Sequence, residues 1–204
     1  MQTVEEAKLA LLSAWPFIKS ECLGVLGSEL HYQAMIYHCL RAHGDVPIDQ
    51  LGMNVKMWIS EPITPLFRLL DEAKHEDYRG GFEPIPDVVI FKPQINGDWR
   101  RRNKQATVLN MLIAIEVKAS ERRNKKLSSR EIQFDIDKLA AHRDEVIARG
   151  ADMLPVMLII DSARSEVERM TPASLHNCAA LAKEKSVAFM YVSPTIEMNS
   201  LQTI

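Results

Sequence analysis

The sequence predicts an α/β fold in which helices flank a mixed central sheet, built as one domain over residues 1–204. Strand and helix patterns alternate through the last third of the chain, which is typical of strand-helix-strand units with parallel strands. Earlier, two β-branched runs lie on either side of an Asn-Gly dipeptide, which favours an antiparallel pair. The chain has 204 residues, 47% of them hydrophobic, and can bury one sizeable core.

The N-terminal part, at about residues 1–43, is predicted to be helical. Apolar residues recur at helical spacing over residues 3–19, despite Pro16 near the end of this segment. They are Val4, Ala7, Leu11, Ala14 and Ile18. A second helix is expected to begin after Gly27-Ser28 and to end near Ala42, before Gly44. Its predicted apolar side consists of Ala34, Tyr37 and Leu40.

The middle of the chain predicts three or four strands and a helix. Residues 46–59 fit one long strand or two short ones, and Pro62 and Pro65 then open a helix that reaches about Glu76. Residues 87–91 and 108–117 predict buried strands. Because Asn96-Gly97 lies between them, we expect an antiparallel hairpin with a long projecting tip. The basic residues on that tip are Arg100, Arg101, Arg102 and Lys104.

The C-terminal part predicts two further helices and two strands. Residues 128–131 have the pattern of a capping box, which opens a helix that ends at Gly150. The predicted apolar face of this helix holds Ile132, Ile136, Leu139, Ala140 and Ile147. Residues 154–160 predict a parallel strand, Thr171-Pro172 begins another helix, and residues 187–192 supply a last strand.

Basic residues are concentrated in one central segment. The formal net charge of the chain is -2, yet 11 Lys or Arg and only three acidic residues lie from Lys92 to Arg130. Besides the tip at 100–104, this segment contains a second basic loop with Arg122, Arg123, Lys125 and Lys126. We expect both loops to flank one site and to contact phosphates on either side of it. Ordinary solvated charge is the alternative.

The apolar runs and the cysteines of the sequence indicate a cellular compartment. No run approaches the roughly 20 apolar residues that span a bilayer, and the N-terminus lacks a signal pattern. We therefore expect a cytoplasmic protein without a membrane partner. The cysteines at 22, 39 and 178 are widely spaced and include no Cys-x-x-Cys pair, which predicts reduced, buried thiols.

The strand at 108–117 leads into a charged pattern. Alternation along the strand puts Glu116 and Lys118 on one face and Ile115 and Val117 on the other. Ionised groups on an apolar strand are costly unless they are paired or bind a cation. Asp87, on the adjacent hairpin strand, supplies a second carboxylate. Oxygen ligands of this kind suit a hard divalent cation.

Pro86-Asp87, followed by Glu116-Val117-Lys118 along the next strand, resembles the motif of the PD-(D/E)XK nuclease superfamily. The predicted order of elements from Glu29 to about Val192 is similar to the core of that family. The resemblance implies a restriction-endonuclease-like fold and a Mg²⁺-dependent deoxyribonuclease, in which Mn²⁺ can substitute for Mg²⁺.

The same resemblance implies roles for individual residues. Asp87 and Glu116 would hold the metal together with the Val117 carbonyl, and Lys118 would position or activate the attacking water. Glu29 resembles the additional helix glutamate that many family members direct towards the metal. Gln133 resembles the glutamine on the helix after the motif, although the aromatic residue often found four positions later is Asp137 here.

Two functional hypotheses remain open from the sequence. The first is a metal-dependent endonuclease that hydrolyses DNA phosphodiester bonds through a metal-activated water. The second is a catalytically inactive module on the same fold that binds nucleic acid or protein. A Glu-x-Lys triplet alone also fits a cross-strand ion pair. Since one active centre cuts one strand, cleavage of both strands would favour a homodimer, for which the sequence identifies no interface.

Overall fold

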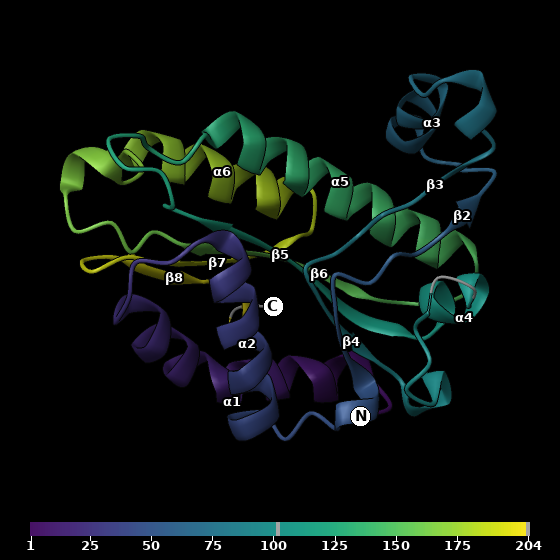
Figure 1. Cartoon of the computed structure of the whole chain (residues 1–204), viewed down its shortest axis with the longest axis horizontal. Helices are drawn as coiled ribbons and strands as arrows, with labels where there is room; N and C mark the ends of the chain where they lie inside the picture. Colours follow the sequence, from purple (N-terminus) through teal and green to yellow (C-terminus); the bar gives the residue numbers. More distant parts are fainter. Residues whose placement is uncertain (101–102, 203–204) are drawn as a thin grey trace.

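A computed structural model of the chain describes residues 1–100 and 103–202. Within these ranges, six strands form one sheet in the order β1-β4-β5-β6-β7-β8 (Figure 1). The strands are β1 (Leu51–Met53), β4 (Val88–Phe91), β5 (Met111–Ala119), β6 (Leu154–Ile160), β7 (Ala188–Val192) and β8 (Glu197–Asn199). The pairs β5-β6 and β6-β7 are parallel, and the other three pairs are antiparallel. The predicted α/β fold with a mixed, helix-flanked sheet is confirmed.

One helical layer covers each face of the sheet (Figure 1). α1 (Val4–Leu23) and α2 (Glu29–His43) lie on one face, and α5 (Ser129–Ala148) and α6 (Pro172–Glu184) lie on the other. Strand side chains alternate between the two layers. Ile115 and Val117 pack in the core with α1 and α2, whereas Ala114 packs in the core with α5 and α6. The alternate residues Glu116 and Lys118 therefore face α5.

The two N-terminal helices follow most of the predicted pattern. α1 runs through Pro16 to Leu23, beyond the predicted end, and all predicted apolar positions except the half-buried Val4 are fully buried. α2 starts after the N-cap Ser28 and ends before Gly44, as predicted. Its predicted apolar side is correct only for Leu40, because Ala34 is exposed and Tyr37 is only half-buried. The buried residues are Tyr32, Gln33, Ile36, Cys39 and Leu40. Because the polar Gln33 is one of these residues, the buried face does not form a continuous apolar pattern in the sequence.

Residues 54–86, which we call the insertion, form a small unit between β1 and β4. It contains β2 (Ile59–Ser60), α3 (Pro65–Glu72), a 3-10 turn (Glu76–Tyr78) and β3 (Gly81–Phe82). β2 and β3 pair antiparallel in a separate sheet, and α3 stands beside α5 (Figure 1). Residues 46–59 therefore supply two short strands rather than one long strand. α3 ends before the predicted boundary, and β3 was not predicted from the sequence.

The connection between β4 and β5 differs from the predicted hairpin tip. The two strands are antiparallel as predicted, but residues 92–110 include a 3-10 turn (Pro93–Ile95) and a short helix, α4 (Lys104–Leu109). Asn96 and Gly97 both adopt positive φ angles, 52° and 65°, as turn residues do. β5 starts only at Met111, because Val108 and Leu109 complete α4, which packs against β2.

The C-terminal elements agree best with the prediction. Ser128 caps α5 by accepting a hydrogen bond from the backbone N–H of Glu131, at 3.2 Å. Most of the predicted apolar face is buried, but Ile147 is 51% exposed. Val146, two turns after Leu139, occupies the buried position instead. β6 has the predicted bounds, Thr171 caps α6, and β7 begins one residue late. The short β8 was not predicted.

Two simpler expectations can also be compared with the structure. The cysteines at 22, 39 and 178 are free and buried, as predicted. Among the helices of the described ranges, none has both the length and the apolar character that crossing a membrane requires.

Candidate metal and catalytic site

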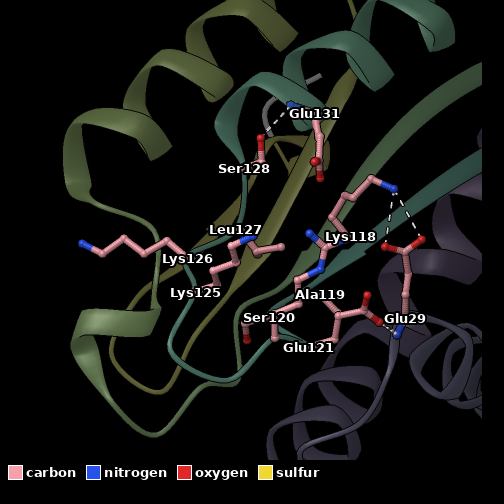
Figure 2. Close-up of a pocket in the computed structure, with 11 residues that line it drawn as sticks. Glu29, Lys118, Ala119, Ser120, Glu121, Lys125, Lys126, Leu127, Ser128 and Glu131 are labelled. Atoms are coloured by element: carbon pink, nitrogen blue, oxygen red, sulfur yellow. Dashed lines mark hydrogen bonds and ion pairs between the residues drawn. The ribbon is translucent and has the colours of Figure 1, made fainter.

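Lys118 is the centre of a group of charged side chains from three elements. Its Nζ lies 3.4 Å from Glu29 Oε1 on α2 (Figure 2). The same Nζ lies 3.2 Å from Asp135 Oδ2 on α5 and 4.0 Å from Glu116 Oε1 on its own strand. Because the Lys118 side chain is only 14% exposed, these carboxylates replace most of the water around the ammonium group.

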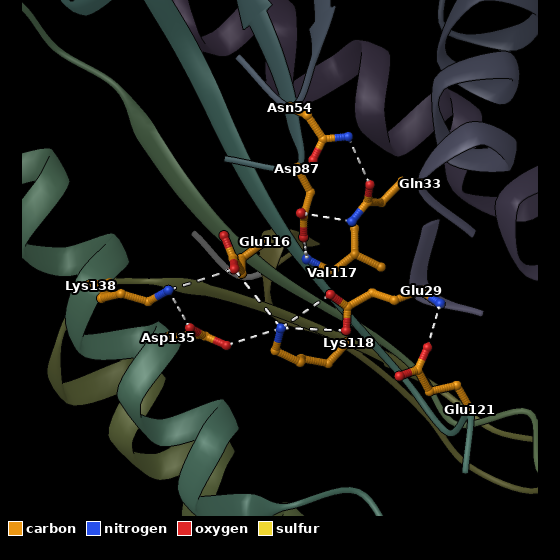
Figure 3. Close-up of polar contacts among 10 residues, drawn as sticks. All are labelled: Glu29, Gln33, Asn54, Asp87, Glu116, Val117, Lys118, Glu121, Asp135 and Lys138. Atoms are coloured by element: carbon orange, nitrogen blue, oxygen red, sulfur yellow. Dashed lines mark hydrogen bonds and ion pairs between the residues drawn. The ribbon is translucent and has the colours of Figure 1, made fainter. Parts of the chain in front are cut away.

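A second lysine lies beside the same carboxylates. Lys138 Nζ, one turn after Asp135 on α5, is 2.6 Å from Asp135 Oδ1 and 3.8 Å from Glu116 Oε1 (Figure 3). Asp135 therefore bridges the two ammonium groups, and Glu116 approaches both. This spacing of three residues puts Asp135 and Lys138 on one side of the helix.

Asp87 is fixed just before the start of β4. Its backbone N–H donates to the Ile115 carbonyl at 3.1 Å, and its carboxylate accepts from the Val117 N–H at 2.6 Å. Gln33 Nε2 donates to the other carboxylate oxygen at 2.7 Å, and Asn54 in turn donates to Gln33 Oε1 at 3.1 Å (Figure 3). Asp87 is thus held beside Glu116 by β5 and α2, with 7% of its surface exposed.

We call these six residues the carboxylate–lysine cluster. Its members are Glu29, Asp87, Glu116, Lys118, Asp135 and Lys138. When every member is ionised, four carboxylates share two ammonium groups, so the cluster carries a formal excess of two negative charges. Such an excess is unfavourable in a part of the protein from which water is largely removed.

The pKa values of the cluster reflect this imbalance. Burial, followed by the nearby charge of Asp87, raises the pKa of Glu116. Burial also raises the pKa of Asp87, against the opposing effect of the Val117 N–H. Burial alone would lower the pKa of Lys118, but its carboxylate neighbours outweigh it and raise the pKa. Lys118 therefore remains a cation at neutral pH, whereas Asp87 and Glu116 favour a proton or a positive ligand.

The structure brings together most of the predicted catalytic residues. Glu116 and Lys118 lie on the α5 side of the sheet, and Asp87 is near enough for its charge to raise the pKa of Glu116. Glu29 extends from α2 and pairs with Lys118. Val117 participates through its backbone N–H. Gln133 is half-buried and joins none of these contacts.

Three residues of the site were missed by the sequence analysis: Gln33, Asp135 and Lys138. A signal for Asp135 was present, since it lies between Ile132, Ile136 and Leu139 on the buried stripe of α5. An acidic residue in such a stripe needs a charged partner. Gln33 gave no comparable signal, because one buried amide on a helix is compatible with many roles.

The basic loop after β5 borders the cluster. A pocket of about 280 Å³ is lined by Glu29 and Lys118 together with Arg122, Lys125 and Lys126 (Figure 2). Arg123 is exposed and lines a neighbouring hollow. This loop and Lys118 therefore share one pocket.

The other basic segment lies elsewhere. Trp99 stacks on Phe91, at the end of β4 remote from Asp87, and Arg100 pairs with Asp98 at 2.8 Å. Lys104 begins α4, just before the start of β5. Because β5 has nine residues and spans about 26 Å at about 3.3 Å per residue, Lys104 lies near the opposite end of this strand from Lys118. The expectation that both basic loops flank one site is wrong for Arg100 and Lys104. Arg101 and Arg102 lie outside the described residues.

Metal binding at the cluster depends on the oxygen donors that it offers. Over residues 1–100 and 103–202, no group of three or more His, Cys, Asp or Glu side chains is arranged to hold a metal ion. Mg²⁺, however, commonly takes one or two carboxylates and keeps several waters. Asp87 and Glu116 fit this smaller requirement, since they are adjacent oxygen donors that repel each other when no cation is present.

Comparisons of this chain with protein-family models, with curated proteins and with solved structures found no match.

Proposed function

We propose that the chain is a divalent-metal-dependent deoxyribonuclease of the PD-(D/E)XK type, with a restriction-endonuclease-like core. The observation that carries this proposal is the convergence of Asp87, Glu116 and Lys118 from neighbouring parts of one sheet. Two hard oxygen donors beside a permanent cation match the needs of phosphodiester hydrolysis, which are charge neutralisation and a positioned water.

Each residue has a distinct part in this proposal. Asp87 and Glu116 hold Mg²⁺, or Mn²⁺ in its place, with the Val117 carbonyl as a third oxygen donor. The cation would polarise a phosphoryl oxygen and lower the pKa of a bound water. Because Lys118 stays protonated between its carboxylate neighbours, it contributes positive charge to the phosphate rather than removing a proton from water. Glu29 and Asp135 orient the Lys118 ammonium group.

The basic loop supports DNA as the substrate. Arg122 and Lys125 line the pocket next to Lys118, so a strand bound there would place phosphates on the loop and at the cluster together. Contacts of this kind give affinity that falls with salt and that depends little on sequence.

Cleavage assays test the proposal directly. Purified protein is incubated with single-stranded, double-stranded and branched DNA in Mg²⁺ or Mn²⁺. We expect cleavage by the wild type and its loss in Asp87→Ala and Lys118→Ala, with the fold retained by circular dichroism. Lys183→Ala, an exposed position on α6, is the matched control and should cut normally. An equal activity of wild type and Lys118→Ala would refute the role of the cluster.

A metal titration separates this proposal from a binding module without catalysis. Calorimetry with Mn²⁺ should show binding to the wild type that is lost in a Glu116→Gln variant. A protein that binds DNA yet shows neither Mn²⁺ binding nor cleavage would be the inactive module, because such a module needs no cation.

A further inference from the structure

A second pocket opens beside the cluster, on the side away from the basic loop. It has a volume of about 230 Å³ and lies between the insertion and α5. Glu116 and Lys138 contribute to its lining, so it directly adjoins the proposed catalytic groups. Its remaining walls come from α3, from residues 82–86 and from α5.

We propose that this pocket accepts one unstacked nucleobase of the DNA strand whose phosphate lies at the cluster. The inference rests on the proposed nuclease function and extends it to the form of the substrate. A nucleobase has two flat apolar faces and a polar edge, and the pocket offers surfaces for both.

The apolar surfaces come from aromatic and aliphatic side chains. The half-buried Phe82 lines the pocket, the fully buried Phe67 packs against it with ring centroids 4.2 Å apart, and Leu139 adds an aliphatic wall from α5. Aromatic side chains bind unstacked bases through their faces, with little regard to base identity. The volume of about 230 Å³ is below the roughly 300 Å³ at which pockets for drug-sized ligands begin, which favours a single ring system.

The polar element is His142, which also lines the pocket. It is only 2% exposed, and among the residues that the structure describes its Nε2 has no hydrogen-bond partner. Buried polar atoms usually have partners, so an orphaned one calls for a ligand or water. Burial lowers the pKa of His142 to about 4, which keeps the imidazole neutral near pH 7. A neutral imidazole can exchange hydrogen bonds with the polar edge of a base.

The pocket has a consequence for the substrate. A base inside an intact duplex is stacked and paired, and it reaches a recess between two elements only after it has left the helix. Single strands already present free bases. We therefore expect the enzyme to prefer single-stranded or locally unpaired DNA to intact duplex.

The test compares two metal-free ligands that differ only in the base. Deoxyadenosine 5′-monophosphate and deoxyribose 5-phosphate are titrated into the full chain in EDTA, and the imidazole signals of His142 are followed by NMR. We expect the nucleotide to shift these signals and to bind roughly 5- to 150-fold more tightly than the sugar phosphate, as stacking on aromatic side chains provides. Phe82→Ala should remove this difference. Leu69→Ala, an exposed position on α3, should keep it.

Equal binding of the two ligands, or nucleotide binding without a change at His142, would overturn the inference. The measurement needs neither metal nor cleavage, so it is independent of the test of the nuclease activity. Cleavage without a preference for the base-bearing ligand would refute only the pocket. Base binding without cleavage would refute the nuclease activity and leave the pocket as a nucleotide-binding site.

Discussion

Replacing Glu145 by alanine is expected to release the insertion from α5. Glu145 is fully buried, and its Oε1 accepts hydrogen bonds from the backbone N–H of Ile63, the backbone N–H of Thr64 and the Thr64 hydroxyl, at 2.7–2.8 Å. Its Oε2 is 2.5 Å from Arg149, which also donates to the Ser60 carbonyl. One side chain therefore joins the insertion to the helix that carries Asp135 and Lys138.

The magnitude follows from what the substitution leaves behind. Glu145→Ala leaves buried hydrogen-bond donors and the positive charge of Arg149 without their partner. Breaking a buried ion pair in this way costs about 3–5 kcal/mol. Glu145→Gln keeps an oxygen for Thr64 and loses mainly the charge-assisted bond to Arg149, which costs about 1.5–3 kcal/mol. Asp144→Ala is the control, because this neighbouring carboxylate is 53% exposed and should change stability by about 0.5 kcal/mol or less.

The effect should also depend on pH in a defined direction. Burial would raise the pKa of Glu145, but the hydrogen bonds from Thr64 and Arg149 outweigh it, so the pKa lies below its usual 4.5. A lowered carboxyl pKa adds stability that is present above pH 4.5 and is lost as the pH falls through the folded-state value. The difference between wild type and Glu145→Ala should therefore shrink in acid.

Urea denaturation, followed by tryptophan fluorescence and circular dichroism, measures these differences at pH 7 and below pH 4. A cost of under 1 kcal/mol for Glu145→Ala at pH 7, or a difference that grows in acid, would refute the reasoning. If the insertion unfolds on its own, the two probes should give separate transitions, since Trp58 lies in the insertion.

Three further predictions concern the site and its surroundings. Gln33→Ala should lower the free energy of unfolding by about 1–3 kcal/mol in urea denaturation, because it leaves one Asp87 carboxylate oxygen without its buried partner. As the pH falls from 6.5 to 4, the stability of wild type relative to His142→Leu should decrease by about 2.5 kcal/mol, because burial lowers the pKa of His142 to about 4 and the unfolded chain takes up the proton more readily. Replacing Arg122 and Lys125 by glutamine should reduce the slope of log affinity for single-stranded DNA against log salt by about 1.4, and an unchanged slope would exclude the loop from phosphate contact.

The fold could be predicted where periodicity and end signals agreed. β6 and α6 each combine an apolar pattern with clear boundaries, and their predicted starts are correct. The prediction was wrong where tertiary contacts decide local structure. Val108 and Leu109 have the composition of a strand, but α4 uses them to pack against β2. The insertion could not be assembled from sequence, since β2 and β3 have two residues each and depend on tertiary contacts with α3 and α4.

The site, too, could be predicted only where a local sequence pattern decides the position of a side chain. Strand alternation correctly placed Glu116 and Lys118 on one face, because a period of two leaves only two choices. It gave no information about which side chains of the following helix would face them. The resemblance suggested Gln133, whereas Asp135 of the same helix contacts Lys118. The position of the Arg100 segment could not be predicted either, since loop residues near a motif in sequence can lie at the far end of the strand that carries the motif.

The charge of the cluster provides a final argument for a cation. Ion pairs that serve stability alone need matched charges, because each uncompensated buried charge is unfavourable. Lys118 and Lys138 pair chiefly with Glu29 and Asp135, so the remaining excess falls on Asp87 and Glu116. Either protons or a divalent cation can neutralise that pair. If protons neutralise the pair, Mn²⁺ should not change the free energy of unfolding at pH 8. If a cation does, the free energy of unfolding should rise with the logarithm of the Mn²⁺ concentration once that concentration exceeds the dissociation constant.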